Sequence, residues 1–152
     1  MKKLIVIILF ISNFTVAQTI EPLSNYSIEE LLIDDNASHI VLEGCISLYS
    51  GVTELTKKKY PKLASEFFES ANTLYPYGII SLSKIKNISY EEAEKVFFLN
   101  VTNLSQEYID EMNNNGKKNG SYFKGSFLGN DLFFCNEVAK SLKLVIMESL
   151  GE

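Results

Sequence analysis

The chain has only two cysteines, and each lies in a row of apolar residues with the spacing of one helix face. The first row has steps of four, three, four and three residues: Val41, Cys45, Leu48, Val52 and Leu55. The second row is of the same kind: Leu128, Cys135, Val138, Leu142 and Val145. Such spacing gathers side chains on one side of a helix, where a neighbour can bury them. The two cysteines are therefore expected to face one core from two different helices.

Two further segments have helical periodicity, and no segment alternates strictly between apolar and polar residues. One helix is expected to start at Pro61, because proline is tolerated in a first turn. Its apolar face consists of Ala64, Phe67, Phe68, Ala71, Leu74 and Tyr75. The other is expected to start at Ser89, which forms a capping box with Glu92. Its face consists of Ala93, Val96, Phe97, Val101, Leu104, Tyr108 and Met112.

These four segments predict an all-α fold, an antiparallel bundle of about four helices that occupies residues 27–152. A short helix opening at Ser27 precedes the first long one, and the last helix is expected to begin near Ser126 or Asn130. The third long helix is expected to fade over residues 113–121. The pattern leaves open whether the segment after Pro76 continues as a kinked helix or forms an extended connection.

Residues 1–17 have the three parts of a bacterial secretory signal peptide: a basic start, an unbroken apolar run and small residues before a cleavage point. The small residues are Thr15 and Ala17, and the apolar run is eight residues long. A membrane-spanning helix needs about 20 apolar residues, so cleavage before Gln18 is expected instead of anchoring. We therefore predict a periplasmic or secreted protein with no membrane attachment after cleavage. Residues 18–26 lack periodicity and are expected to form a mobile arm.

An even number of cysteines in an exported chain favours a disulfide. In an up-and-down bundle the first and last main helices are antiparallel neighbours, and the two cysteines lie at heights that match within about two turns. We therefore predict a Cys45–Cys135 disulfide between these helices. Closing a loop of this length would stabilise the fold by about 4–5 kcal/mol in the chain-entropy model. The alternatives are two buried free thiols or a redox-active pair, and the second lacks the usual Cys-x-x-Cys spacing.

The charge of the chain limits the classes of molecule that it is expected to bind. The full chain has 14 lysines, no arginine and 19 acidic residues, and without residues 1–17 its net charge is −7. The absence of arginine removes the planar donor group best suited to phosphates and base edges. Net negative charge also opposes binding to nucleic acids and anionic membranes. We expect no nucleic-acid binding, and a protein partner that is cationic.

Motifs of catalysis or metal binding are missing from the sequence. It has no glycine-rich phosphate loop, no nucleophile elbow and no zinc-ligand spacing. His39, the only histidine, could act as a general base oriented by Glu43 one helical turn later, but no nucleophile is tied to it. Asp131 is interpreted as an acidic residue in the first turn of the last helix. We expect no enzymatic activity, no cofactor and no metal site.

Two features indicate binding. The first is a stripe of small residues along the Cys45 helix: Gly44, Ser47 and Gly51. Glycines inside a helix cost about 1 kcal/mol each against alanine, so a close neighbour or a bound partner should offset them. The sequence leaves open which of the two applies. The second feature is a set of tyrosines, a residue type enriched at interfaces: Tyr60, Tyr75 and Tyr77.

The stretch from Gly44 through Cys45 to Val52 resembles the first-cysteine helix of the Rap1a/Tai4-type secretion-system immunity proteins. With Phe134-Cys135 on the last helix, the chain also resembles a group of small, functionally uncharacterised periplasmic helical proteins with one cysteine pair. The first resemblance implies a protein that binds and neutralises a toxic effector. Our hypothesis is a non-enzymatic exported protein that binds another protein, such as an inhibitor or immunity factor. The alternative is a self-associating structural or stress-related envelope protein.

Overall fold

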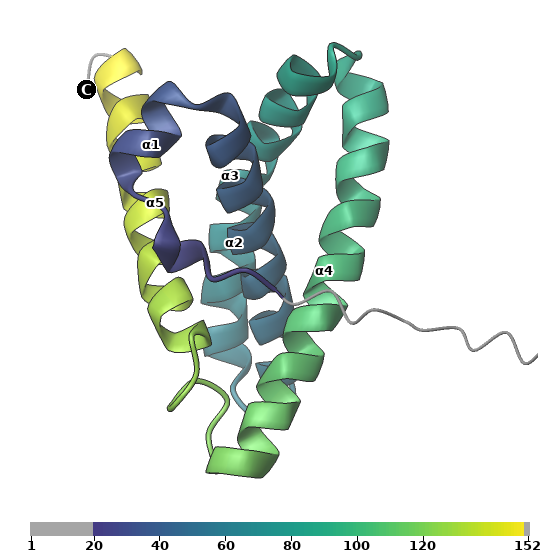
Figure 1. The fold of residues 1–152 in the computed structure, drawn as a ribbon, viewed down its shortest axis with the longest axis vertical. Coiled ribbons are helices and arrows are strands. Elements are labelled where there is room, and N and C mark those ends of the chain that lie inside the picture. The colour runs from purple at the N-terminus through teal and green to yellow at the C-terminus, as the bar shows by residue number, and fades with distance from the viewer. Residues whose placement is uncertain (1–19, 151–152) are drawn as a thin grey trace, which may run out of the picture.

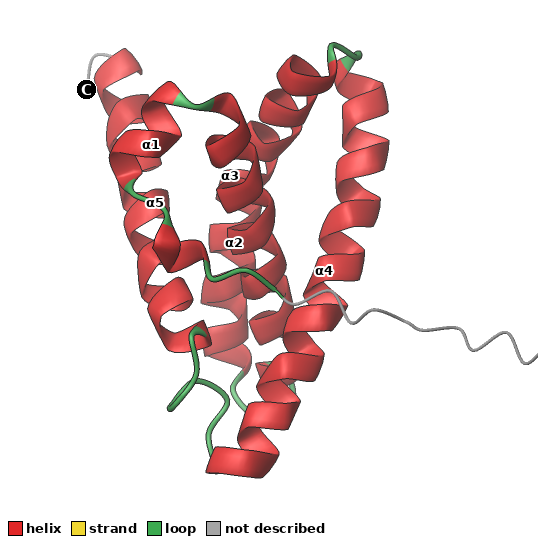
Figure 2. Ribbon diagram, viewed as in Figure 1, coloured by secondary structure: helices red, strands yellow, loops and turns green. Residues whose placement is uncertain are grey.

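The computed structural model of the chain describes residues 20–150, and the predicted signal peptide at residues 1–17 lies outside them. A short 3-10 helix and one short helix come first: η1 (Leu23–Asn25) and α1 (Ile28–Ile33). Four long helices follow: α2 (Asp35–Thr56), α3 (Pro61–Lys86), α4 (Tyr90–Asn119) and α5 (Leu128–Leu150). The long helices run alternately in opposite directions (Figure 1), and the described residues contain no strand (Figure 2). The predicted all-α antiparallel bundle with four main helices is confirmed.

Local side-chain bonds start α1 and α4 where the sequence predicts. Ser27 and Glu30 form a capping box at α1, and Ser89 and Glu92 form one at α4. Asp34 ends α1 and starts α2, because its carboxylate accepts bonds from the backbone N–H groups of the first turn of α2, at 2.8 and 3.3 Å. These bonds satisfy donors that have no partner within the helix.

Helix α3 continues through Pro76, which answers the question left open for this segment. Proline has no N–H group, so the carbonyl four residues earlier, at Asn72, loses its helical partner. Both residues are exposed, so water can satisfy that carbonyl. Two residues further, Gly78 is buried against the ring of Phe97, and any side chain at position 78 would overlap that ring. The absence of a side chain there lets α3 approach α4 closely.

Helix α4 extends to Asn119, so the expectation that it fades over residues 113–121 is wrong for most of that range. Asn115 explains the extra length. It is 7% exposed, and its Nδ2 donates to the carbonyls of Ser121, Tyr122 and Lys124 at 2.8, 3.1 and 3.1 Å. The last turns of α4 are thus tied to the loop that follows. The helix stops at Gly120, whose φ of 70° suits glycine.

The centre of the bundle is α2, which packs against α3, α4 and α5. Val41, Cys45 and Leu48 of the predicted stripe are fully buried, Val52 is 1% exposed and Leu55 is half-buried. The faces predicted for the flanking helices are less completely covered. Phe68 on α3 is 56% exposed and Val96 on α4 is 43% exposed. The periodicity therefore identified the helices correctly but overestimated how much of each face has a neighbour.

Residues 20–26 pack against the bundle, although the sequence predicted a mobile arm over 18–26. Leu23 is only 3% exposed. Its side chain fills the space left by the missing side chain of Gly44, where a Cβ would lie 2.6 Å from a methyl carbon of Leu23. Ser24 donates its backbone N–H to the carboxylate of Asp131 on α5. Ile20 and Tyr26 also pack against the core. These apolar contacts and the Ser24–Asp131 hydrogen bond hold the segment, and none of them leaves a periodic pattern in the sequence.

Candidate functional site

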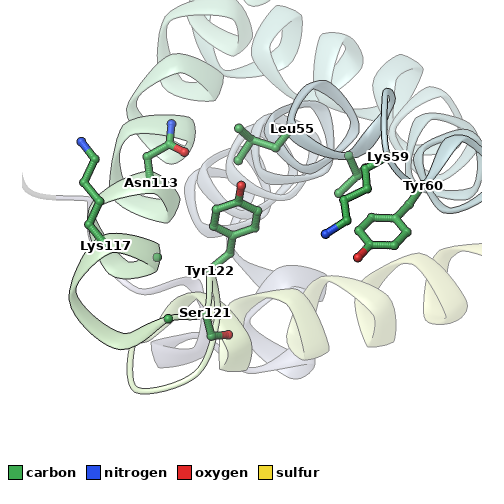
Figure 3. A pocket seen from close by; sticks show the side chains of 10 residues that line it. Leu55, Lys59, Tyr60, Asn113, Lys117, Ser121 and Tyr122 are labelled. Atoms are coloured by element: carbon green, nitrogen blue, oxygen red, sulfur yellow. The ribbon is translucent and has the colours of Figure 1, made fainter.

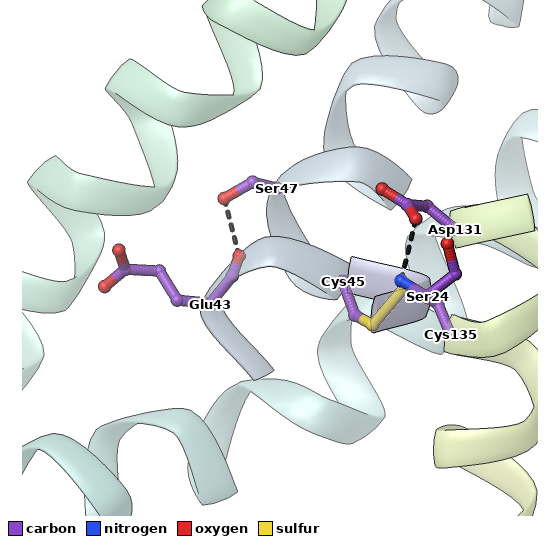
Figure 4. Close-up of a disulfide and its surroundings, with 6 residues drawn as sticks. All are labelled: Ser24, Glu43, Cys45, Ser47, Asp131 and Cys135. Carbon is purple, nitrogen blue, oxygen red and sulfur yellow. Dashed lines mark hydrogen bonds between the residues drawn. A yellow bond between two sulfur atoms is a disulfide. The ribbon is translucent and has the colours of Figure 1, made fainter. Parts of the chain in front are cut away.

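The two cysteines form the predicted disulfide, which joins α2 to α5 (Figure 4). Their Cα atoms are 5.3 Å apart, and both residues are completely buried. The bond encloses a loop that contains α3 and α4, since the cysteines are 90 residues apart in the sequence. A buried bond in this position constrains the unfolded chain and holds α5 against α2.

Asp131 takes part in this same region and has a larger role than the sequence suggested. It is completely buried, and its Oδ1 accepts the N–H of Ser24 at 2.9 Å (Figure 4). Its Oδ2 has no hydrogen-bond partner among the described residues. Burial, together with the nearby Asp131 carboxylate, raises the pKa of Tyr108 on α4. The sequence indicated this role of Asp131 only by placing an acidic residue one turn before a core cysteine. Nothing in the sequence pattern identified Ser24 as its hydrogen-bond partner.

The small-residue stripe is inside the bundle, so its interpretation as a contact surface is wrong. All three residues are buried: Gly44, Ser47 and Gly51. Gly44 receives Leu23, and Gly51 faces α4, with the Met112 methyl carbon 3.1 Å from where a Cβ would be. The hydroxyl of Ser47 donates to the backbone carbonyl of Glu43 at 2.7 Å (Figure 4). The stripe lets Leu23 and α4 approach α2 closely. The sequence had left such an approach open as the alternative to a surface that contacts a partner.

The three tyrosines do not form one site. Tyr60 precedes α3 at one end of the bundle and is half-exposed. Tyr75 and Tyr77 lie in the middle of α3 and are partly buried. The ring of Tyr75 packs edge-on against Phe97 of α4, with ring centroids 5.4 Å apart. Tyr75 and Tyr60 line two different cavities, which are described below.

His39 is oriented by Glu43, as the sequence allowed. Its Nε2 lies 3.5 Å from a carboxylate oxygen of Glu43, which also accepts the side-chain N–H of Asn100 on α4 at 3.0 Å. Burial lowers the pKa of His39, partly opposed by Glu43 and assisted by Lys86. The other ring nitrogen is buried and has no hydrogen-bond partner among the described residues. With the Phe97 ring 6.0 Å away, the imidazole serves as a packed contact between α2 and α4.

A groove of about 540 Å³ lies between α3 and α4, and α2 contributes its floor. We call it the α3–α4 groove; the residues that matter most for its chemistry are Ile46, Glu54, Phe68, Tyr75, Phe98 and Val101. Phe68 and Phe98 come from opposite walls and are 56% and 59% exposed. Two exposed phenylalanines in one concave surface are a feature of sites that bind apolar groups.

One carboxylate, that of Glu54, lines the α3–α4 groove, and it forms an ion pair with Lys57 at 2.6 Å. None of the described lysines lines the groove. A second carboxylate, that of Glu94, is close enough to Tyr75 to raise the pKa of that phenol, although burial contributes more. Apolar walls beside carboxylates suit a ligand that is both apolar and positively charged.

A second cavity, of about 580 Å³, opens at the end of the bundle where α2 and α4 finish (Figure 3). We call it the basal cavity. Its polar lining comes from Lys59, Tyr60, Asn113, Lys117, Ser121 and Tyr122. It shares no lining residue with the α3–α4 groove.

Among the side chains that the structure describes, those of residues 20–144, there is no group of three or more His, Cys, Asp or Glu that could hold a metal ion. Nor is any helix in that part of the chain long and apolar enough to span a membrane. Comparison of the chain with protein-family models, with curated proteins and with solved structures found no match.

Proposed function

We propose that this chain is a non-enzymatic, exported protein-binding domain that takes up an apolar, cationic segment of a partner protein in the α3–α4 groove. Binding of this kind would let it act as an inhibitor or immunity factor. The observation that carries the proposal is the exposure of Phe68 and Phe98 on opposite walls of one groove. Aromatic side chains supply much of the binding energy in protein interfaces, because they bury a large area when a partner covers them.

The shape of the groove supports a helical segment as the ligand. Its two walls are helices, and its floor is apolar at Ile46. An amphipathic helix can lay its apolar face in such a groove, with side chains one turn apart reaching the floor. The aromatic side chains at the walls would then flank the bound helix.

Charge supports a cationic partner. Glu54 lines the groove, Glu94 is near Tyr75, and the chain beyond residue 17 has a net charge of −7. Opposite charge on the partner would speed its encounter with the groove and would make the complex weaken with salt. The disulfide supports export, because such bonds persist in oxidising compartments.

Site-specific photo-crosslinking in cells that export the protein tests this proposal. Benzoylphenylalanine replaces Asn72, an exposed residue that lines the groove, or Phe133, which is 69% exposed on α5. We expect a crosslink to one partner protein from position 72, within a segment rich in Lys, Arg and apolar residues, and none from position 133. Equal crosslinking from both positions, or crosslinks only to acidic segments, would contradict the proposal.

A second test compares how tightly two variants bind the partner. Phe98→Asp changes the groove, and Phe133→Asp is the matched control outside it. Loss of one aromatic anchor should weaken the complex by about tenfold or more, whereas the control should bind normally. Sedimentation velocity tests the alternative function, which is self-association of the protein. If position 72 crosslinks only to a second copy, and Phe98→Asp turns a dimer into a monomer, the protein is self-associating and the partner proposal is wrong.

A further inference from the structure

The lysines of this acidic chain are concentrated at one end of the bundle. Residues 55–65 and 112–130 contain seven of the twelve lysines beyond residue 17, and neither range contains an Asp or Glu. The two ranges meet in space, because α2 and α4 end there and α3 and α5 begin there (Figure 1). We call this the lysine-rich end; its lysines are Lys57, Lys58, Lys59, Lys62, Lys117, Lys118 and Lys124. Four acidic residues border the two ranges directly, so the seven lysines leave a smaller local excess of positive charge: Glu54, Glu66, Glu111 and Asp131.

Helix-end electrostatics account for only part of this concentration. A lysine near a helix C-terminus is stabilised by the helix dipole, which fits the lysines that follow α2 and those that end α4. Lys57 is also paired with Glu54, at 2.6 Å. Lys62, however, is in the first turn of α3, where positive charge is unfavourable, and Lys124 is in the loop before α5.

The basal cavity opens at the lysine-rich end. In Figure 3 the Lys59 ammonium points between the rings of Tyr60 and Tyr122. Its Nζ is 5.1 Å from the centre of the Tyr60 ring. The Tyr60 side chain, with a smaller effect of Tyr122, raises the pKa of Lys59. The cavity thus combines ammonium groups with neutral hydroxyl and amide donors.

The loop that carries Tyr122 is fixed by hydrogen bonds on its buried side. Asn115 donates hydrogen bonds to three carbonyls of the loop 121–124, and its own Oδ1 accepts from Asn119 at 2.6 Å. The Tyr122 ring packs on Gly116, where a Cβ would lie 3.1 Å from the ring. A buried side chain is therefore used to fix a loop whose exposed side lines the cavity. Such preorganisation lowers the cost of binding a ligand there.

We propose that the basal cavity binds a phosphate group, with Lys59 supplying charge and Tyr122 supplying a hydroxyl donor. Lysine binds phosphate as a point charge and does not need the planar fork of arginine, which this chain lacks. The phosphate can belong to a free phosphorylated molecule or to the headgroup of an anionic lipid, since both present the same oxygens. This site is separate from the α3–α4 groove and does not depend on the proposed protein partner.

Titration of the 15N-labelled protein with sodium pyrophosphate at low salt tests the proposal by NMR. We expect saturable shifts confined to the amides around residues 59–62 and 113–124. Lys59→Gln should weaken binding by about tenfold, because it removes a charge-assisted contact. Lys140→Gln is the matched control: it changes the net charge equally, but Lys140 lies on α5 in an ion pair with Glu137. The control should bind as the unaltered protein does.

No saturable shift up to about 10 mM pyrophosphate would overturn the proposal. So would an equal loss of affinity in Lys140→Gln, since that result would mean general charge attraction without a site. Co-sedimentation with phosphatidylglycerol vesicles then distinguishes the two sources, with phosphatidylcholine vesicles as control. Binding to the anionic vesicles that pyrophosphate displaces identifies a lipid headgroup, whereas pyrophosphate binding without vesicle binding identifies a free phosphate ligand.

Discussion

The two sides of the central helix α2 are built in different ways. Towards α5 the contacts are closed: a buried disulfide joins the helices, Asp131 holds the backbone of Ser24, and Leu23 fills the space over Gly44. Between α3 and α4 the surface is open, with Phe68 and Phe98 more than half exposed. The closed side carries stability, and the open side carries the surface available to a partner. Substitutions on the two sides should therefore have opposite consequences.

The largest expected effect is on the closed side. Replacing both cysteines with alanine should lower the free energy of unfolding by about 4 kcal/mol, because the unfolded chain is no longer constrained over a loop of 90 residues. Urea unfolding followed by circular dichroism measures the change. Reduction of the unaltered protein should have the same effect. A loss below about 1 kcal/mol would mean that packing alone holds α5 against α2.

Asp131→Ala should have a smaller effect on the same side, about 2 kcal/mol, because it leaves the N–H of Ser24 without its buried acceptor. Hydrogen exchange provides the specific readout: the Ser24 amide should exchange much faster in the variant. Asp131→Asn, which keeps an acceptor oxygen, should restore part of the protection. Unchanged exchange at Ser24 in the alanine variant would show that Leu23 alone holds the segment.

Replacing His39, which packs between α2 and α4, should have a smaller effect on the free energy of unfolding. Because burial lowers the pKa of His39 from its ordinary value of 6.5, the folded protein binds fewer protons here than the unfolded chain does. Its contribution to stability is therefore present above pH 6.5 and is lost as the pH falls below that value. Unfolding measured at several pH values should show a shallower dependence between 7.5 and 5.5 in His39→Gln. Parallel curves for the two proteins would contradict this assignment.

The smallest expected effect on stability is on the open side. Phe98→Ser should change the free energy of unfolding by less than about 0.5 kcal/mol, because the ring is already more than half exposed. Leu23→Ser is the matched change on the closed side, and it should cost about 2–3 kcal/mol because Leu23 is buried. Thermal melting of both variants makes the comparison. Equal destabilisation would show that Phe98 belongs to the core and is not held ready for a partner.

Much of the fold was predictable from short-range patterns. The stripe from Val41 to Val52, the capping boxes at Ser27 and Ser89, and the restart at Pro61 each depend on residues within about one helical turn of one another. The disulfide was predictable because the chain offers only two cysteines, both in core-facing positions. The candidate sites were less predictable. Phe68 was assigned to the core because its spacing fits the apolar face of α3, and spacing alone does not show whether a neighbour covers it.

By itself the sequence determined where most of the helices begin and which face of each is apolar, because both depend on backbone hydrogen bonds and side chains close in the chain. The tertiary structure decided which faces are covered. It placed Leu23 over Gly44, turned the small-residue stripe inward and left Phe98 uncovered between two helices. It also brought the lysines that follow α2 beside those that end α4, although more than 50 residues separate them. Such contacts join distant segments, and a helical pattern specifies that a face needs a partner without specifying which segment supplies it.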